Sequence, residues 1–443
     1  MSSNRKLLLL ALAGLFVRAA FLLLEPETPL IGDEQVWTNW AIKDLATGKV
    51  RFSPFRAGMI FYPPLYSYFV AAFHEPFATL VAVKWAQVVV SSLIVLAVGR
   101  VGATVFGERA GPVAGAIAAF HPELVWFSVH FWSETLFLAF LWWAFERMLA
   151  ADARASTRSA VAAGVLWSLA VLTRETCLYL TPLAAAWLWW RPSAEGAARR
   201  AAAFLLAACL TIAPWTYRNW VVFHAFVPVA TSGGLALYQG NSGLTRDEVY
   251  RHYEAVEGRI EQYRWARRMG MKAILDRQPT WIFEKLRDEM PRFWEADSLA
   301  LIHIRRGAYA DVGPAAAVAA WALVVLPYLA LLSCFVAGLA ALRLERRTGL
   351  LLSFLVLYNL LHVTTHGFAR YRLPIMPVVF VVAAYAVAEW RAGRYPALSA
   401  RRRVLAMALA LALALSIAPS LRRSVGDPAK GFAEPQDAAG EPR

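Results

Sequence analysis

Two adjacent acids, Asp33 and Glu34, follow the first long apolar run of the chain, and an aromatic-rich stretch follows them. Ionisable groups at a membrane boundary cost free energy to dehydrate, so their position points to a functional site. One interpretation is a general base, or a carboxylate that orients an acceptor hydroxyl. The other interpretation is that Asp33 only caps the start of a helix, a position that Asp favours. The pair alone does not separate the two.

A third acid, Glu134, follows Ser133 at the start of a later apolar run. A carboxylate placed just inside an apolar helix usually has a partner. We therefore interpret Glu134 as a second acid of the same site, and a capping or snorkelling Glu is the alternative. Glu134 and His121 could also hold a divalent metal, although no metal-defining spacing is present. The sequence requires no cofactor and leaves a divalent metal open.

Arginine is the side chain best suited to bidentate recognition of a phosphate. Arg218, Arg370 and Arg372 stand at turns on the outward side of the membrane, where the charge rule does not favour basic residues at the ends of spans. These three arginines are the candidates for binding a lipid-linked phosphate, and ordinary contact with lipid headgroups is the alternative. Arg18 and Arg174 lie within or beside apolar runs, where we expect them to pair with acids, Arg174 with its neighbour Glu175.

The composition defines the elements that must position these residues. Of 443 residues, 59% are hydrophobic and 17% are charged, whereas soluble proteins carry about a quarter charged residues. The apolar residues form blocks long enough to cross a bilayer as helices. The sequence thus predicts an all-α polytopic membrane protein with about eleven transmembrane helices. The net charge of +14 is explained by basic cytoplasmic loops rather than by nucleic-acid binding.

The basic loops also assign a side to each segment, because cytoplasmic loops collect Lys and Arg. The first outer loop is expected to hold an interfacial helix over 34–48 and, after Pro63 and Pro64, a re-entrant or interfacial helix. The predicted regions are an N-terminal transmembrane region (1–217) with a catalytic outer loop (25–81), a mainly helical extracytoplasmic segment (218–313), a C-terminal transmembrane region (314–420) and a disordered tail (421–443).

Taken in order, these motifs resemble the GT-C superfamily of membrane glycosyltransferases. The resemblance is to glycosyltransferase family 39, with its protein mannosyltransferases and bacterial aminoarabinose transferases. The ordered set spans about 15–390 and consists of Arg18, Gly32-Asp33-Glu34, Tyr62-Pro63-Pro64-Leu65-Tyr66, Ser133-Glu134, Leu172-Thr173-Arg174, Pro214-Trp215 with Arg218-Asn219, Gly240-Asn241 and Arg370-Tyr371-Arg372-Leu373-Pro374.

The resemblance implies a role for each matching residue. Asp33 matches the acid regarded as catalytic, with Glu34 as its acidic neighbour, and Glu134 matches the second-loop carboxylate. The donor phosphate would contact Arg218 and Arg370 or Arg372. The supporting positions are Arg18, Tyr62, Pro63, Pro64, Tyr66, Arg174 and Asn241. Some relatives have Lys where Tyr62 stands, so a phosphate contact from that loop would need Arg56 or an outward arginine.

The sequence therefore predicts a multi-pass enzyme of the inner (plasma) membrane with an outward-facing active site. It would transfer a sugar from a polyprenyl-phosphate donor to a glycan, lipid or protein acceptor of the cell envelope. A lipid-sugar flippase or secondary transporter is the alternative, but that class places polar residues near the membrane midplane. A scaffold whose segment 218–313 binds a partner is the third interpretation.

Overall fold

The computed structural model describes residues 2–25, 28–46, 60–190, 195–309 and 312–426. Over these ranges the chain forms α-helices and two 3₁₀ segments and no strands, which confirms the predicted all-α class. Apolar runs become helices because a segment in hydrocarbon must satisfy its own backbone hydrogen bonds.

Six of the described helices are long and apolar enough to cross a membrane by length and composition. They are α1 (Ser3–Leu24), α4 (Leu80–Phe106), α10 (Ala197–Phe223), α16 (Pro314–Ala341), the continuous segment of η2 and α18 (Ala369–Arg391), and α19 over Ala400–Leu421. The other predicted spans are shorter or more polar helices: α5 (Ala110–Phe120), α7 (Glu134–Ala153), α8 (Thr157–Thr173), α9 (Thr181–Trp189) and α17 (Arg346–Val363). The polytopic membrane fold is confirmed, and the number of about eleven crossings stays a prediction.

The loop predicted to be the first outer loop (25–81) contains α2 (Asp33–Ala46) and α3 (Leu65–His74). Trp37 and Ala41 of α2 are buried in one cluster with Tyr66 and Val70 of α3. Trp37 and Ala41, which belong to the apolar face expected to lie on the membrane, are therefore covered by protein. The ten-residue α3 is too short to cross a bilayer, in agreement with the interfacial or re-entrant helix predicted after Pro64.

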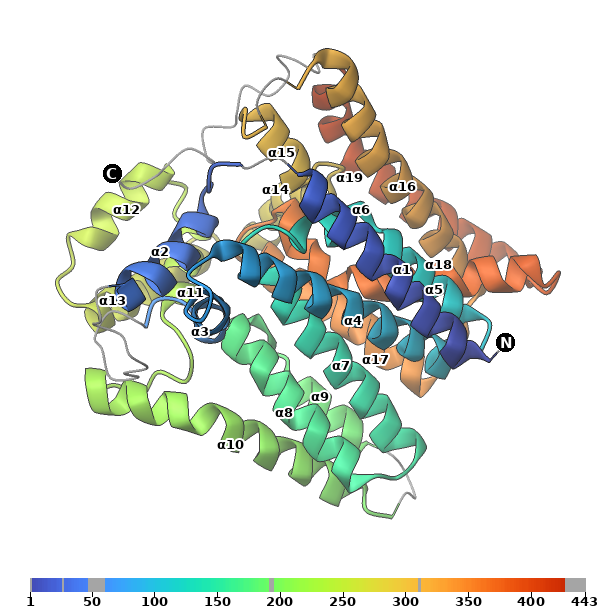
Figure 1. Ribbon diagram of the computed structural model, residues 1–443, viewed down its shortest axis with the longest axis horizontal. Helices are drawn as coiled ribbons and strands as arrows, with labels where there is room; N and C mark the ends of the chain where they lie inside the picture. The colour runs from blue at the N-terminus through green and yellow to red at the C-terminus, as the bar shows by residue number, and fades with distance from the viewer. Residues whose placement is uncertain (1, 26–27, 47–59, 191–194, 310–311, 427–443) are drawn as a thin grey trace.

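The predicted extracytoplasmic segment is helical, but it begins later than expected because α10 continues to Phe223. Its helices are α11 (Ser232–Asn241), α12 (Arg246–Glu254), α13 (Arg259–Leu275), α14 (Trp281–Trp294) and α15 (Leu299–Arg305). Figure 1 shows α11, α12 and α13 gathered with α2 and α3 at one end of the molecule, away from the N-terminus.

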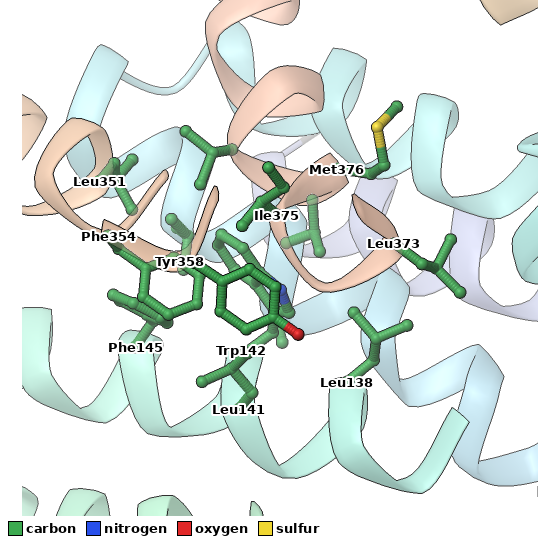
Figure 2. Close-up of a cluster of buried hydrophobic side chains, with 14 of the residues drawn as sticks. Leu138, Leu141, Trp142, Phe145, Leu351, Phe354, Tyr358, Leu373, Ile375 and Met376 are labelled. Carbon is green, nitrogen blue, oxygen red and sulfur yellow. The ribbon is translucent and has the colours of Figure 1, made fainter. Parts of the chain in front are cut away.

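A buried cluster supports η2 (Ala369–Ile375) and the start of α18 (Met376–Arg391). Figure 2 shows Trp142 and Phe145 of α7 facing Tyr358 of α17, with Ile375 packed beside them. The Trp142 Nε1–H donates a hydrogen bond of 3.2 Å to the carbonyl of Pro374. Since η2 carries Arg370 and Arg372, this packing determines where the two arginines lie.

The C-terminal helix α19 (Ala400–Gly426) continues past 421, where the sequence predicted a disordered tail to begin. The rest of that predicted tail, residues 427–443, lies outside the described residues, as does Arg56.

Candidate active site

Asp33 and Arg370, which lie far apart in the sequence, form an ion pair. Asp33 is the first residue of α2, and its Oδ2 lies 2.9 Å from Nη1 of Arg370 in η2. The two side chains are 34% and 19% exposed, so the pair is accessible from outside the protein. Asp33, the predicted catalytic acid, and Arg370, one of the three candidate phosphate-binding arginines, are thus brought together.

The guanidinium of Arg370 has further contacts besides Asp33. Its Nη2 donates a hydrogen bond of 3.1 Å to the hydroxyl of Tyr371. Its Cζ lies 4.8 Å from the ring centre of Trp132 and 4.9 Å from that of Tyr371. Aromatic faces attract a guanidinium because their quadrupole presents negative charge to it. Arg370 is therefore held by a bond and two rings that do not depend on Asp33.

A second acid and arginine form an ion pair beside the first. Glu134, the first residue of α7, accepts a hydrogen bond of 2.6 Å from Arg174, which follows α8. The Glu134 side chain is 1% exposed and that of Arg174 is 18% exposed. Tyr371 lies between the two pairs, because the Arg174 Cζ is 5.6 Å from its ring centre. The predicted pairing of Arg174 with Glu175 is wrong, since Glu175 accepts from Ser232 at 3.1 Å.

Glu34 connects two loops through hydrogen bonds from backbone N–H groups. Its Oε1 accepts a hydrogen bond of 3.0 Å from the Phe131 N–H, and its Oε2 accepts one of 3.2 Å from the Ile31 N–H. The residue is 2% exposed. Burial raises the pKa of the Glu34 carboxyl to about 7, although the two backbone N–H groups lower it. This geometry gives Glu34 a positioning role, because it joins the start of α2 to the loop before α7.

The Tyr62-Pro63-Pro64 stretch forms one wall of the site. The Tyr62 ring centre lies 5.0 Å from that of Trp37, and burial together with the nearby Asp33 raises the pKa of its hydroxyl. Pro63 and Pro64 are buried immediately before α3. The Tyr66 hydroxyl donates to Gln87 at 2.6 Å, which fixes α3 on α4. Tyr62 thus occupies the site without bringing a positive charge to it.

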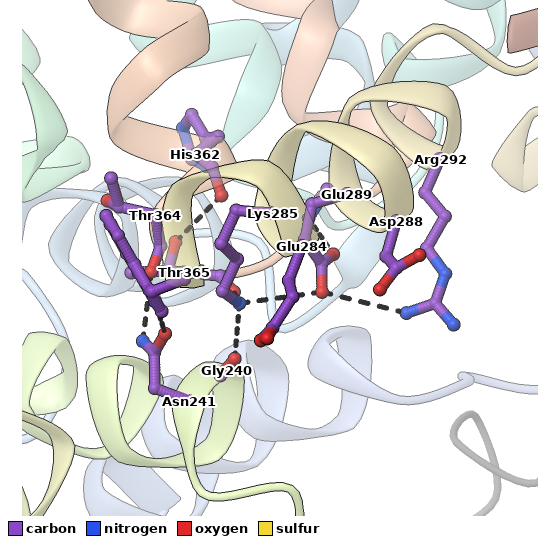
Figure 3. Close-up of polar contacts among 12 residues, drawn as sticks. Gly240, Asn241, Glu284, Lys285, Asp288, Glu289, Arg292, His362, Thr364 and Thr365 are labelled. Carbon is purple, nitrogen blue, oxygen red and sulfur yellow. Dashed lines mark hydrogen bonds and ion pairs between the residues drawn. The ribbon is translucent and has the colours of Figure 1, made fainter. Parts of the chain in front are cut away.

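Asn241 belongs to a clamp that holds the turn before η2 (Figure 3). Its Nδ2 donates 2.9 Å to the Thr364 carbonyl, and the Lys285 Nζ donates 3.1 Å to the Thr365 carbonyl. A Cβ at Gly240 would overlap the Thr365 carbonyl, and one at Gly367 would overlap the backbone of α14. The glycines therefore allow α11 and α14 to close on this turn, which leads directly to Arg370.

The contacts of the remaining three arginines predicted for the site differ from those of Arg370; these three are Arg18, Arg218 and Arg372. Arg372 donates 3.3 Å to Glu123 and 3.0 Å to the Asp297 carbonyl, and its side chain is only 1% exposed. Arg218 donates 2.9 Å to Asn219 and lies 4.7 Å from the Trp215 ring centre. Arg18 was expected to pair with an acid, but it donates to Ser91 at 2.8 Å and to carbonyls of α1 and α5. These contacts make Arg18 and Arg372 parts of the helix packing.

The suggested metal ligands do not form a recognisable metal site. Glu134 is paired with Arg174, and the His121 ring packs against Phe380 with ring centres 4.8 Å apart. Over the described ranges, no three His, Cys, Asp or Glu side chains are grouped so as to hold a metal ion.

The sequence interpretation missed a buried polar cluster next to Glu34. Glu25 lies 3.1 Å from His130 and 3.6 Å from Lys84, and the Tyr309 hydroxyl donates 3.1 Å to Glu25. Burial raises the pKa of Glu25 and lowers that of His130. Two signals could have identified it: an acid that closes the first apolar run, and Lys84 inside the next one.

The comparisons with known proteins agree with this fold. A family model described as dolichyl-phosphate-mannose-protein mannosyltransferase matches residues 62–217, which is less than half of the chain. No curated protein matches the chain significantly. The match includes the Tyr62-Pro63-Pro64 stretch, Glu134 and Arg174, but not Asp33 or Arg370.

Several solved membrane glycosyltransferases are similar in structure. The Archaeoglobus fulgidus oligosaccharyltransferase tethered with an acceptor peptide has 14% identity and a TM-score of 0.54, over 97% of this chain and 55% of that one. The same organism's AglB, in complex with an inhibitory peptide and a dolichol-phosphate, has 16% identity and a TM-score of 0.50, over 100% and 56%. ArnT from Cupriavidus metallidurans, bound to undecaprenyl phosphate, has 16% identity and a TM-score of 0.50, over 95% and 64%.

These similarities confirm the predicted all-helical, polytopic membrane fold, which the chain shares with the solved oligosaccharyltransferase and ArnT structures. The chain spans between 55% and 64% of the length of these structures. Shared architecture at this identity does not transfer an activity, because function depends on the residues of the site.

Proposed function

We propose that this chain, with its GT-C fold, is a membrane glycosyltransferase that moves a sugar from a polyprenyl-phosphate donor to an acceptor hydroxyl. The single observation that carries the proposal is the accessible pair of Asp33 and Arg370, which combines a base with a phosphate ligand. The site contains both groups that such a transfer needs. The transporter alternative is not favoured, because the similar structures are transferases.

In the proposed reaction the acceptor oxygen attacks the anomeric carbon of the donor sugar. Its proton passes to the Asp33 carboxylate, and a new carbon–oxygen bond forms. The bond between that carbon and the lipid phosphate breaks, and the phosphate leaves with the electron pair. Arg370 stabilises the negative charge that develops on the departing phosphate. Inversion at the anomeric carbon is the expected outcome.

The surrounding groups would orient these two side chains. Glu34 fixes the start of α2, where Asp33 lies, through the Phe131 and Ile31 backbone N–H groups. Tyr371 and Trp132 hold the guanidinium of Arg370. Glu134 and Arg174 complete the wall next to Tyr371. Preorganised groups of this kind lower the barrier because they need not reorient during the reaction.

Partners and location are part of the proposal. ArnT binds undecaprenyl phosphate and AglB binds a dolichol-phosphate, which supports a polyprenyl-phosphate donor here. The acceptor would be a glycan, lipid or protein of the cell envelope. The distribution of basic loops supports an inner (plasma) membrane location with the site facing outward.

The test is sugar transfer by the full chain in proteoliposomes, from labelled polyprenyl-phosphate donors to envelope extracts. Asp33→Asn should lower the rate by about 10²–10⁴-fold, the usual contribution of a positioned general base. Asp276→Asn is the matched control, since Asp276 forms an exposed ion pair with Lys272 on α13. Its rate should equal that of the unaltered protein. Near-normal transfer by Asp33→Asn would remove the assignment of Asp33.

A further inference from the structure

The guanidinium that would bind the donor phosphate already holds the carboxylate that would act as the base. Nη1 of Arg370 lies 2.9 Å from Asp33 Oδ2, while Nη2 is bonded to Tyr371. We propose that the donor phosphate displaces Asp33 from Arg370, so that Asp33 can accept a proton only when a donor is bound. This inference rests on the proposed function, and it makes the donor the first substrate to bind.

The contacts indicate which partner moves. Arg370 keeps the Tyr371 hydroxyl and the Trp132 face when Asp33 leaves. Its backbone is fixed on both sides, by the Trp142 bond to Pro374 and by the clamp on Thr364 and Thr365. Asp33 is one-third exposed and starts a helix that follows Gly32, whose φ is +61°. The carboxylate is therefore the group that withdraws.

The relative strengths of the two interactions of Arg370 favour the exchange of Asp33 for phosphate. A partly exposed ion pair contributes little to stability, because water solvates the separated charges nearly as well. A phosphate that meets a guanidinium makes stronger, charge-assisted hydrogen bonds and can bind in bidentate form. The phosphate thus outcompetes a single carboxylate oxygen for Arg370.

The neighbouring pair cannot make the same exchange. Glu134 is 1% exposed, and its Oε1 lies 2.6 Å from Arg174. If a phosphate took Arg174, the buried carboxylate would be left without a compensating charge, which costs several kcal/mol. Arg370 is therefore the phosphate ligand that can be released, and Arg174 stays with Glu134.

The experiment measures binding of undecaprenyl phosphate, which lacks a sugar, to the full chain in nanodiscs. The proteins are the unaltered chain, Asp33→Asn, Arg370→Gln and the double variant. Asp33→Asn should bind the phosphate about threefold to fivefold tighter, the equivalent of a lost exposed ion pair. In the Arg370→Gln background, Asp33→Asn should not change phosphate binding, because Asp33 and the phosphate no longer compete for a guanidinium. Arg370→Met replaces Arg370→Gln if the latter does not fold.

Each outcome is decisive. Equal or weaker binding by Asp33→Asn overturns the exchange. An equal gain in both backgrounds also overturns it, since the gain then comes from general charge repulsion. If the unaltered chain binds no undecaprenyl phosphate, or if Arg370→Gln binds as well as it, the proposed donor site fails. These last results differ from the first two, so the two failures are distinguishable.

Discussion

Two acid–arginine pairs lie on either side of Tyr371, and they differ mainly in exposure. The Asp33 side chain is 34% exposed, whereas that of Glu134 is 1% exposed. A carboxylate with access to water can leave its arginine at little cost, but a buried one cannot. The same two chemical groups thus give an exchangeable pair at Asp33 and a permanent pair at Glu134.

Within one site, the two pairs contribute differently to function and to stability. A permanent pair preserves the shape of the wall, and an exchangeable pair can bind and release a substrate. Tyr371 contacts both arginines, so the exchangeable pair is positioned against the permanent one. The residue types alone, an acid and an arginine in each pair, would have given both pairs the same role.

The largest expected difference is in stability, when the same substitution removes either arginine. Arg174→Met leaves the buried Glu134 without its partner, and we expect a loss of about 3–5 kcal/mol. Arg370→Met leaves Asp33 in contact with water, so a loss of about 1 kcal/mol or less is expected. Thermal unfolding in detergent measures both. Equal losses would remove the distinction between the pairs.

A smaller loss of stability is expected when the turn that carries the exchangeable pair is disturbed. Gly240→Ala places a Cβ against the Thr365 carbonyl, so α11 or the turn must shift. Overpacking of this kind costs about 1–3 kcal/mol. Gly349→Ala is the control, because nothing lies within 4 Å of its added Cβ. Unfolding midpoints measure the effect, and undecaprenyl phosphate binding should weaken only in Gly240→Ala.

The pH dependence of stability tests the anchor that positions Asp33. The folded pKa of Glu34, about 7, lies above its ordinary value, so the folded state binds more protons than the unfolded state between about pH 4.5 and 7. Stability should therefore fall as the pH rises through that window, by up to about 1.4 kcal/mol per pH unit. Glu34→Gln should flatten this slope, and Asp276→Asn should not. A slope unchanged in Glu34→Gln would assign it to other groups.

The smallest expected effect concerns the residue between the pairs. Tyr371→Phe removes the hydroxyl that accepts from Arg370 but keeps the ring beside Arg174. We expect stability to fall by about 0.5 kcal/mol, the low end for one hydrogen bond, and undecaprenyl phosphate binding to weaken about twofold. Tyr385→Phe, on the same segment but elsewhere in the fold, should change neither quantity. If Tyr371→Phe instead disturbs the pair of Glu134 and Arg174, the separate roles assigned to the two pairs are wrong.

The sequence predicted the helical fold and put an outer-loop acid and the arginines of the last outward turn on the same side of the membrane, but it did not predict their ion pair. It could not choose between Arg370 and Arg372. These residues lie in a 3₁₀ helix, where each residue advances by about 120°, so positions two apart face different sides. Arg370 faces Asp33, while Arg372 faces Glu123 in the interior. Nothing in the residue types distinguishes 3₁₀ from α-helix at this place.

Local sequence was also misleading about Arg174. Glu175 is adjacent in the chain, but its carboxylate accepts from Ser232 at the start of α11. The true partner, Glu134, is 40 residues away and is brought close because α7 packs along α8. Partners of buried charges depend on helix packing, which a single sequence does not contain. For the same reason, the sequence did not reveal the contact between Glu25 and Tyr309.

Asp33 and Arg370 are separated by 337 positions in the chain. At about 5–20 residues per second, a ribosome needs roughly 20–70 s to pass from one to the other. During this interval Asp33 is already part of the chain, but its guanidinium partner is not. The ion pair can therefore form only after residue 370 has been synthesised, and a shorter nascent chain lacks the proposed catalytic pair.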